Sequence, residues 1–318
     1  MMSNANLAEK IYQASLSCGF DNCGIIPLDY LDGFKKLFEE RMHKVPSNAP
    51  FLKILGGLAK TKKRFPWAKS VVICSFWYGK YHYPQELQGR YAKDFFLWPE
   101  DHPQKGFDHL RFEDWLSEQG IRWAGGEQFG HISVGSLRYA AMMAGMGIIR
   151  KNNFFYTENG SYNLLQGYVI DQECELIHHT KLKPCSDSCD LCRKGCKTKA
   201  LSAPYTFNAL KCVSFWTTFG KGIVPPYLKA DMFEEWVCGC DNCQDACPYN
   251  RKHDWNEGET FSDLEELAPN LLPEKVLEQS DDYLVEHVIS KTAKHLKRSD
   301  IAVLRRNAKR AIRFHDKL

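Results

Sequence analysis

Eight of the thirteen cysteines lie in two short runs, and their spacing suits metal or redox chemistry. The first run, "CSDSCDLCRKGC", spans residues 185–196, and the second, "CGCDNCQDACP", spans residues 238–248. Cys212 lies between them. In the bacterial ferredoxin pattern C-x2-C-x2-C-x3-C-P, three cysteines surround one iron–sulfur cube and the fourth reaches another. The two runs therefore predict two [4Fe-4S] clusters whose ligands are exchanged between the runs.

Zinc is the alternative, because C-x2-C pairs also form tetrahedral zinc sites. Each run contains C-x2-C-x3-C, and Pro248 follows the second one. Both features favour clusters over zinc. The remaining thiols are scattered, and we expect them to be small buried residues. They are Cys18, Cys23, Cys74 and Cys174.

The composition is that of a globular protein with one large or two smaller domains. The chain has 318 residues, of which 44% are hydrophobic and 25% charged. The N-terminal residues lack the apolar core of a signal peptide, and no apolar stretch approaches the roughly 18 residues of a membrane span. We therefore expect a cytoplasmic protein with no membrane partner, in which clustered thiols serve metal or redox chemistry.

Positive charge is concentrated at the C-terminal end. Residues 294–317 hold nine Lys or Arg and two Asp, so this segment is +7 while the whole chain is +3. Such a tail could contact a polyanion such as tRNA, whereas nothing indicates a DNA partner. The alternative is an amphipathic helix packed on the core, because Ile301, Leu304, Ala308 and Ala311 share one helical face.

Hydrophobic periodicity predicts alternating helices and strands over the first 180 residues, which indicates an α/β or α+β domain. The expected helices are 5–17, 107–119 and 136–146, the expected strands are 69–78 and 162–171, and residues 41–50 are expected to form a loop.

The composition changes at Pro184 and again after Pro248, which suggests three parts. Residues 1–180 would form an α/β cofactor and substrate domain, and residues 181–255 a double-cluster domain. Residues 256–318 would form a helical segment that packs back on the core.

Several segments resemble epoxyqueuosine reductases, the corrinoid iron–sulfur enzymes that complete queuosine biosynthesis in tRNA and are related to reductive dehalogenases. The similar segments are "GCDNCQDACPYN", "GRYAKDF", "RYAAMMAGMGIIRKN", "NGSY" and "LRRNAKRAI". The resemblance implies an α+β fold: a nitroreductase-like α/β cobalamin-binding domain with a ferredoxin-like double [4Fe-4S] cluster domain. Longer members continue into a helical-repeat domain, which this chain is expected to lack.

The resemblance also implies the cluster ligands. One cluster would take Cys185, Cys189, Cys192 and Cys247, and the other Cys196, Cys212, Cys240 and Cys243. Cys238 is then spare, and its role is open. The spacing between Cys185 and Cys189 is one residue longer than is usual in the family.

Further site residues follow from the same segments. The resemblance implies cofactor contacts for Tyr91, Arg138, Lys151, Asn152 and Ser161. His131 stands where these reductases carry a proton-donating aspartate, and Tyr139 is the second candidate donor. Arg150 replaces a glycine, and we expect it to narrow the pocket or to pair with an anionic substrate group.

The leading hypothesis is a cobalamin-dependent reductase, an oxidoreductase in which electrons pass through two [4Fe-4S] clusters to cobalt and then to substrate. An external donor of the flavodoxin or ferredoxin type would supply them. The alternatives are an electron-transfer or activator protein without corrinoid, a reductive dehalogenase-like enzyme with a non-tRNA substrate, and an RNA-binding protein with structural metal. The substrate, the donor and the oligomeric state stay open.

Overall fold

The computed structural model describes all residues except 1–3, 98–103, 126–133, 252–253, 292–295 and 318. The chain forms two compact units. Unit 1 consists of Met1–Tyr78 and Pro99–Cys189, and unit 2 of Gly79–Trp98 and Asp190–Leu318. The expected boundary at residue 180 therefore falls nine residues later, and segment 79–98 joins the cysteine-rich unit. Residues 256–318 belong to that unit as well.

Unit 1 is built on a four-stranded antiparallel sheet with the order β1-β2-β6-β3. The two long central strands pair over their full length, from Ser70 opposite Ile170 to Trp77 opposite Asn163. β2 is almost entirely buried because helices cover both faces of the sheet. The strands are β1 (Asn22–Pro27), β2 (Ser70–Trp77), β3 (Trp123–Gly125) and β6 (Asn163–Ile170), with a separate hairpin of β4 (Ile148–Ile149) and β5 (Phe155–Tyr156).

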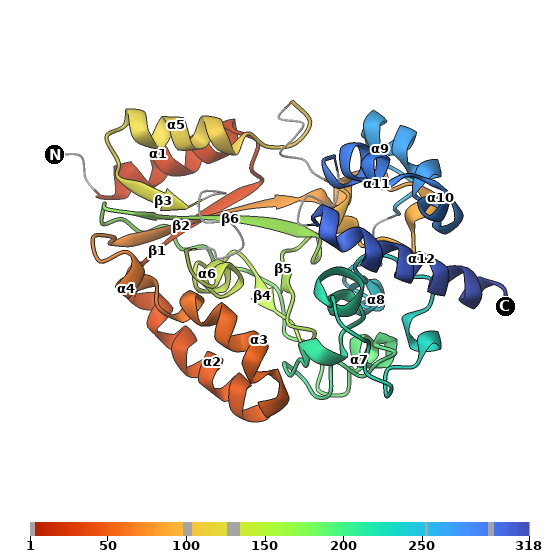
Figure 1. Ribbon diagram of the computed structural model, residues 1–318. Helices are drawn as coiled ribbons and strands as arrows, with labels where there is room; N and C mark the ends of the chain where they lie inside the picture. Colours follow the sequence, from red (N-terminus) through yellow and green to blue (C-terminus); the bar gives the residue numbers. More distant parts are fainter. Residues whose placement is uncertain (1–3, 98–103, 126–133, 252–253, 292–295, 318) are drawn as a thin grey trace. The chain divides into compact units, whose positions relative to one another are not determined.

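Two layers of helices enclose this sheet (Figure 1). On one face, α5 lies beside α1, and the Phe112 ring of α5 lies 5.3 Å from the Tyr168 ring of β6. On the other face, Phe34 and Phe38 of α2 pack in one hydrophobic cluster with Val71 and Ile73 of β2. The helices are α1 (Asn4–Ser17), α2 (Asp32–Lys44), α3 (Ala49–Ile54), α4 (Thr61–Arg64), α5 (His109–Glu118) and α6 (Leu137–Met143).

Helix α6 approaches the sheet closely because two glycines leave room for it. A Cβ atom on Gly24 of β1 would lie 2.7 Å from Cβ of Ala144, and one on Gly167 of β6 would lie 2.2 Å from Cδ2 of Leu137. Neither distance is sterically possible, so larger residues would push α6 away. This close packing fixes the start of the segment that leads from α6 into the β4–β5 hairpin.

Unit 2 has short helices joined by long irregular segments. Its small hydrophobic cluster contains Val213, Trp216 and Trp236. Segment 79–98 is joined to the cysteine-bearing part by a bridge between Tyr91 and Cys238. The helices are α7 (Leu191–Gly195), α8 (Asn242–Asp245), α9 (Ser262–Leu267), α10 (Pro273–Glu278), α11 (Asp281–Tyr283) and α12 (Ile301–His315), with π-helical segments Phe215–Phe219 and Leu284–Ile289.

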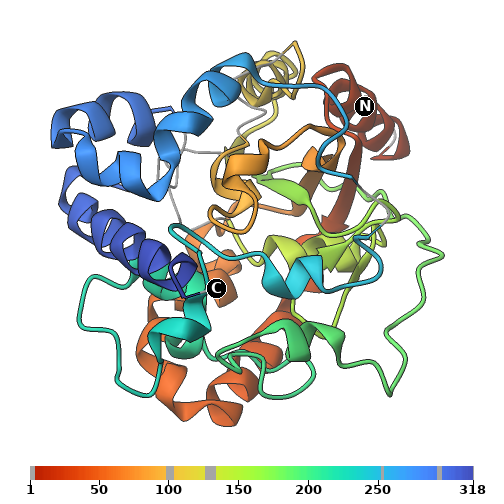
Figure 2. The same ribbon diagram turned by 90° about the vertical axis from the view of Figure 1, so that its right-hand side faces the viewer.

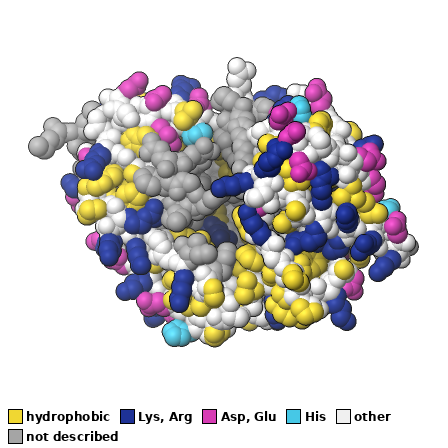
Figure 3. All heavy atoms as spheres, viewed as in Figure 1, with side chains coloured by type: hydrophobic (Ala, Val, Ile, Leu, Met, Phe, Trp, Pro, Cys, Tyr) yellow, Lys and Arg dark blue, Asp and Glu magenta, His cyan; other side chains and the backbone are white. Residues whose placement is uncertain are grey.

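The basic tail forms α12, which packs along α10 and the segment Phe215–Phe219 (Figure 2). Its arginines donate to backbone carbonyls of unit 2. Arg305 donates to Val276 and Gln279, and Arg306 donates to Trp216 at 2.7 Å and Gly222 at 3.0 Å. Basic side chains mark the surface around α12 in Figure 3, but these arginines are largely engaged inside the unit. The structure therefore favours the packed amphipathic helix.

Most of the expected elements are confirmed within one to three residues. They are the helices α1, α5, α6 and α12 and the strands β2 and β6. The prediction that residues 41–50 form a loop is wrong, because α2 continues to Lys44 and α3 begins at Ala49. Pro46 begins a short 3-10 turn between the two helices, so the proline separates them without a long loop.

Replacing Arg306 with Met should destabilise unit 2. The carbonyls of Trp216 and Gly222 would lose a charged donor, which typically costs about 1–3 kcal/mol. We expect the thermal unfolding midpoint to fall by roughly 2–6 °C in anaerobic calorimetry of the cluster-loaded protein. Lys309→Met is the matched control, because Lys309 is exposed on the same helix and should change the midpoint little. Equal midpoints for the two variants would contradict the structural role of Arg306.

Candidate functional site

Four cysteines gather in unit 2 from three segments. Cys196 directly follows α7, Cys212 precedes the segment Phe215–Phe219, and Cys240 and Cys243 lie at α8. Burial raises the pKa of the Cys243 thiol well above its usual value, and the charges of Cys212 and Cys196 add to this effect. Burial, with Cys212 and Cys243, acts in the same way on the pKa of Cys240. These mutual influences make the four thiols close neighbours, and each residue is partly exposed.

Backbone amides face three of these sulfurs. The Ala200 amide donates to Sγ of Cys196 at 3.2 Å, the Asn242 amide donates to Cys240, and the amides of Ser214 and Phe215 donate to Cys212. These bonds lower the pKa of Cys212, but burial outweighs them and raises it to about 11. Among the residues that the structure describes, no three His, Cys, Asp or Glu side chains converge as ligands of a single metal ion. Four neighbouring cysteines with amide donors to their sulfurs suit a [4Fe-4S] cluster, which is held by four cysteines and tuned by hydrogen bonds to sulfur.

The other expected ligand set divides between the units. Cys185 and Cys189 belong to unit 1, whereas Cys192 and Cys247 belong to unit 2 and are buried there. Cys192 lies near enough to Cys243 to influence its pKa. The surroundings of Cys185 and Cys189 are therefore described within unit 1, and those of Cys192 and Cys247 within unit 2.

Two basic residues of the β4–β5 hairpin contact the first cysteine run within unit 1. The Lys151 ammonium donates to three backbone carbonyls, those of Ser186 at 2.7 Å, Asp187 at 3.0 Å and Cys189 at 3.1 Å. The Arg150 guanidinium donates to Sγ of Cys185 at 3.7 Å. The irregular segment 185–189 is thus held from the side by the hairpin.

The surroundings of Cys238 differ from those of the neighbouring cysteines. Its thiol is fully buried, and its Sγ lies 3.9 Å from the Thr218 hydroxyl. Burial raises its pKa to about 12. Its backbone pairs with that of Tyr91, so Cys238 links segment 79–98 to the second cysteine run.

Lys93 is a central residue that the sequence analysis did not identify. Its buried ammonium lies 3.2 Å from Asp241 and 3.2 Å from Asp245, and 4.9 Å from the Trp255 ring centroid. Asp241 stands between Cys240 and Cys243 in the sequence, so this ion pair anchors the second cysteine run. About 150 residues separate Lys93 from its partners, and no local pattern could have indicated the contact.

The five expected cofactor residues have different environments. Arg138 is exposed, and its guanidinium donates to the Asn153 carbonyl at 2.7 Å, beside the hairpin loop. Asn152 is buried and donates to the Tyr156 hydroxyl at 2.8 Å, and Ser161 is buried just before β6. The Lys151 ammonium donates to carbonyls of the first cysteine run.

Tyr91 is the fifth of these residues. It lies in unit 2, is fully buried and donates its hydroxyl to the Leu271 carbonyl at 2.6 Å. Its side chain therefore stabilises the unit and has no surface left for a cofactor.

The structure describes one of the two candidate proton donors, Tyr139. His131 lies outside the described residues. Tyr139 lies in the hydrophobic cluster of unit 1, with its ring 5.7 Å from that of Phe34. A Cβ atom on Gly33 would lie 2.3 Å from the Tyr139 hydroxyl. Burial raises the pKa of Tyr139 and makes it a weaker acid, so the structure counts against it as a donor.

The burial of Arg150 does not fit the expected pairing with an anionic substrate group. Only 1% of its surface is exposed, so it cannot pair with an anionic group of a substrate in solvent. Its guanidinium lies over the Tyr156 ring at 5.2 Å and donates to Cys185.

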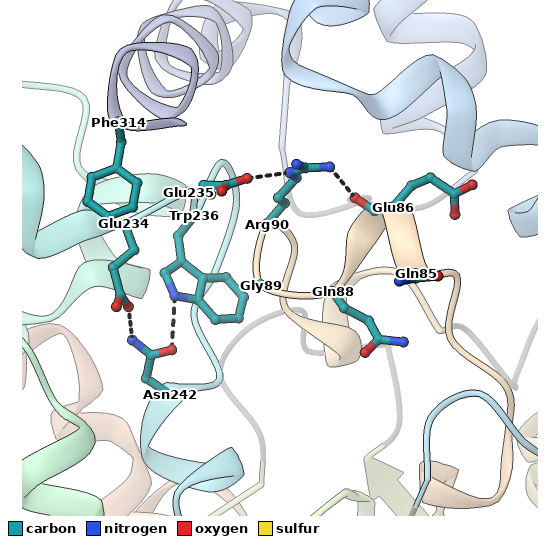
Figure 4. A pocket seen from close by; sticks show the side chains of 10 residues that line it. All are labelled: Gln85, Glu86, Gln88, Gly89, Arg90, Glu234, Glu235, Trp236, Asn242 and Phe314. Carbon is teal, nitrogen blue, oxygen red and sulfur yellow. Dashed lines mark hydrogen bonds and ion pairs between the residues drawn. The ribbon is translucent and has the colours of Figure 1, made fainter. Parts of the chain in front are cut away.

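A polar hollow of about 620 Å³ lies within unit 2 (Figure 4). Two of its three carboxylates, those of Glu234 and Glu235, have partners, and the third belongs to Glu86. Glu235 accepts from Arg90 at 2.7 Å, and Glu234 accepts from Asn242 at 2.6 Å. Arg90 also holds the pKa of Glu235 below its usual value, although burial acts in the opposite direction. The hollow presents side chains that stabilise the unit and no cluster of reactive groups.

Comparison with known proteins agrees with this site. Residues 185–250 match the model of a 4Fe-4S double cluster binding domain. The epoxyqueuosine reductase of Cyclobacterium marinum is 30% identical over 266 residues, which cover 79% of this chain and 82% of that enzyme. The epoxyqueuosine reductase of Cellulophaga algicola is 29% identical over 248 residues, 76% of each chain. A crystal structure of epoxyqueuosine reductase with an epoxyqueuosine-modified tRNA-Tyr stem loop has a TM-score of 0.71 at 23% identity, with 98% of this chain and 82% of that chain covered.

The double-cluster domain and the mixed α/β fold define an iron–sulfur oxidoreductase. The chain belongs to the epoxyqueuosine reductase family. The expected family, the enzyme class and the 4Fe-4S double-cluster domain are thereby confirmed. Within the described parts of the chain, no helix has the length and hydropathy of a membrane span.

Removing Cys243 should abolish one cluster. The anaerobically reconstituted protein should hold about eight iron atoms, two clusters of four. We expect Cys243→Ala to lose about half of this iron and of the acid-labile sulfide. Cys238→Ala is the matched control from the same run, because its thiol lies apart with Thr218, and its iron content should equal that of the unaltered chain. Full iron content in Cys243→Ala would exclude this cysteine as a ligand.

Proposed function

We propose that this chain is an epoxyqueuosine reductase that acts on epoxyqueuosine in tRNA. The observation that carries the proposal is the 30% identity to the Cyclobacterium enzyme over 266 residues, which includes both units. The solved relative with an epoxyqueuosine-modified tRNA stem loop has the same fold and supports tRNA as the substrate carrier.

The reaction needs electrons and protons in equal number. When an epoxide is reduced to an alkene, both C–O bonds break, a C=C bond forms and the oxygen leaves as water. This change consumes two electrons and two protons. The proposed electron source is an external donor, and the electrons pass through the two clusters.

We assign the cluster ligands as follows. Cys196, Cys212, Cys240 and Cys243 hold one cluster, which their proximity and their amide donors in unit 2 support. Cys185, Cys189, Cys192 and Cys247 hold the other. Support for the second set is the crossing pattern of the two runs and the fixed position of segment 185–189 against Lys151.

Cobalamin is the proposed second cofactor. The described residues fit it in part: the exposed Arg138 guanidinium is available, whereas Tyr91 and Lys151 have other roles. The backbone groups of Arg150, Asn153 and Phe154 are engaged within the loop or by Arg138. When bound, cobalamin supplies a cobalt centre that takes electrons from the clusters and reduces the substrate. Arg138 would orient a polar group of the cofactor through the donors that it does not use on Asn153.

His131 is the proposed proton donor to the departing oxygen. An imidazole has an ordinary pKa near 6.5, so part of the population is protonated at neutral pH. The proposal depends on the position of His131 in the sequence, seven residues before Arg138. A solved relative from Bacillus subtilis, with a TM-score of 0.70 at 22% identity, is described as having an aspartate-bearing catalytic loop swung out of the active site.

The proposed electron donor is an acidic protein of the flavodoxin or ferredoxin type. Between residues 191 and 229 the chain holds seven Lys or Arg and no Asp or Glu. This segment contains Cys196 and Cys212, so its positive charge lies close to a proposed cluster in the sequence. Three of its lysines, Lys194, Lys197 and Lys221, form ion pairs with Asp190, Glu234 and Asp300, and the others carry the proposal. Opposite charges would steer such a donor toward this part of unit 2.

A further proposal concerns tRNA contact through the tail. Since Arg305, Arg306 and Arg310 donate to groups inside unit 2, only exposed basic residues of the helix remain for phosphates. We propose Lys309 and Arg313 of the helix, and Lys317 directly after it, for this contact. Each phosphate contact removed should flatten the salt dependence of binding.

Turnover of a tRNA stem loop that carries epoxyqueuosine tests the proposal directly. The protein loaded with both clusters and cobalamin, with a chemical reductant, should convert the nucleoside to a product lighter by one oxygen in mass spectrometry. His131→Asn should lower kcat by about 10²–10⁴-fold, the usual contribution of a positioned acid.

The control is His179→Asn, since His179 is exposed and lies in another segment of unit 1. It should keep full activity. Cobalamin binding without any product from the stem loop would favour a dehalogenase-like enzyme with another substrate. Full activity of His131→Asn with an unchanged pH profile would remove His131 from the mechanism.

A further inference from the structure

A buried arginine lies directly against one of the proposed cluster ligands. The Arg150 guanidinium donates to Sγ of Cys185 at 3.7 Å, and only 1% of the arginine surface is exposed. We propose that Arg150 raises the reduction potential of the cluster held through Cys185 by placing a fixed positive charge on that sulfur. This inference rests on the proposed assignment of Cys185 as a ligand.

The position of Arg150 is fixed by the hairpin that carries it. Its amide donates to the Phe154 carbonyl at 3.0 Å, and its carbonyl accepts from the Asn153 amide at 2.8 Å. Asn153 closes this tight loop with a φ of 67°, a conformation that asparagine tolerates better than most residues. The guanidinium also lies over the Tyr156 ring at 5.2 Å. These contacts leave the side chain little freedom to move away from Cys185.

The cysteine is fixed by the neighbouring residue of the same loop. Lys151 binds the carbonyls of Ser186, Asp187 and Cys189, which belong to the segment that begins at Cys185. The Cys189 amide donates to the Ser186 carbonyl at 3.1 Å and closes this segment into a turn. Arg150 and Lys151 are consecutive in the hairpin loop. Lys151 therefore holds the segment 185–189, and Arg150 contacts the sulfur of Cys185.

The contact acts on the redox equilibrium for an electrostatic reason. A reduced cluster carries one more negative charge than the oxidised cluster, so a nearby cation stabilises the reduced state more. Hydrogen bonds to the sulfurs and local charge are known determinants of cluster potential. A charged donor to a thiolate is also stronger than a neutral one. Low exposure increases the effect because solvent screens the charge poorly.

Other roles of Arg150 fit the geometry less well. A substrate contact would need an accessible guanidinium, and this one is buried. Arg305 and Arg306 of α12 donate to backbone carbonyls, whereas Arg150 donates to the sulfur of a proposed cluster ligand.

Redox titration monitored by EPR tests the inference on the full-length, anaerobically reconstituted protein. Arg150→Met keeps much of the side-chain volume but removes the charge and the donor. We expect the ratio of reduced to oxidised cluster at a fixed potential to fall about tenfold, a shift of about 59 mV for a one-electron couple. The other cluster should keep its midpoint. Arg150→Lys keeps the charge and should shift the midpoint less than Met does.

Arg64→Met is the matched control. Arg64 also belongs to unit 1, lies over an aromatic ring, that of Phe65 at 5.0 Å, and donates to a backbone carbonyl. It should leave both midpoints unchanged. An unchanged midpoint in Arg150→Met with full iron content would overturn the inference. If Arg150→Met loses a cluster, Arg150→Gln decides: a lower midpoint supports the inference, and an unchanged midpoint overturns it.

Failure of the ligand assignment gives a different result. Cys185→Ala should lose or alter the same EPR signal that shifts in Arg150→Met. Full iron and two unchanged signals in Cys185→Ala would remove Cys185 from the ligand set, whatever the arginine variants show. The stem-loop assay is independent of both measurements.

Discussion

The cysteine-bearing loops have little regular backbone hydrogen bonding, so long side chains from other segments must hold them in place. In unit 1, Lys151 binds three carbonyls of segment 186–189. In unit 2, buried Lys93 holds Asp241 and Asp245 around the second run, and Asn307 donates to the carbonyls of Thr217 and Val237 at 2.9 Å. Cluster ligands must keep their separations to within a fraction of an ångström, and these contacts supply the rigidity that helices and strands supply elsewhere.

This constraint also explains the use of positive charge. Thiolate-bound clusters are anionic, and burying them is favourable only beside cations or hydrogen-bond donors. Lys93 is buried against the carboxylates of Asp241 and Asp245, and Arg150 is buried against the sulfur of Cys185. Much of the charge of the basic tail is also used inside unit 2. Arg306 and Arg310 donate to backbone carbonyls of that unit, including the carbonyl of Trp236. The concentration of arginine at the C-terminal end is therefore mainly a packing feature, with Lys309 and Arg313 left at the surface.

Residue type alone proved a weak guide to the cofactor residues. Tyr91, Tyr139 and Lys151 occur in segments that resemble reductases, yet each side chain is used inside its unit. The Tyr139 ring packs against Phe34, and burial raises its pKa. The Lys151 ammonium, with three carbonyl partners, has no remaining donor. Arg138 differs because it is exposed at the edge of the hairpin loop. Accessibility, which depends on the packed structure, separates these residues.

The sequence by itself determined the local features: the strands Ser70–Trp77 and Asn163–Ile170, the helix Ile301–His315, and the two cysteine runs with the chemistry that they indicate. Each depends on periodicity or spacing within about 15 residues, which short-range sterics and burial dictate. Only the tertiary structure decided that segment 79–98 joins the cysteine-rich unit, that Lys93 meets Asp241, and that Arg150 meets Cys185. These contacts join residues 35 to about 150 positions apart, and their energy depends on burial and charge in the folded chain, which no local pattern records.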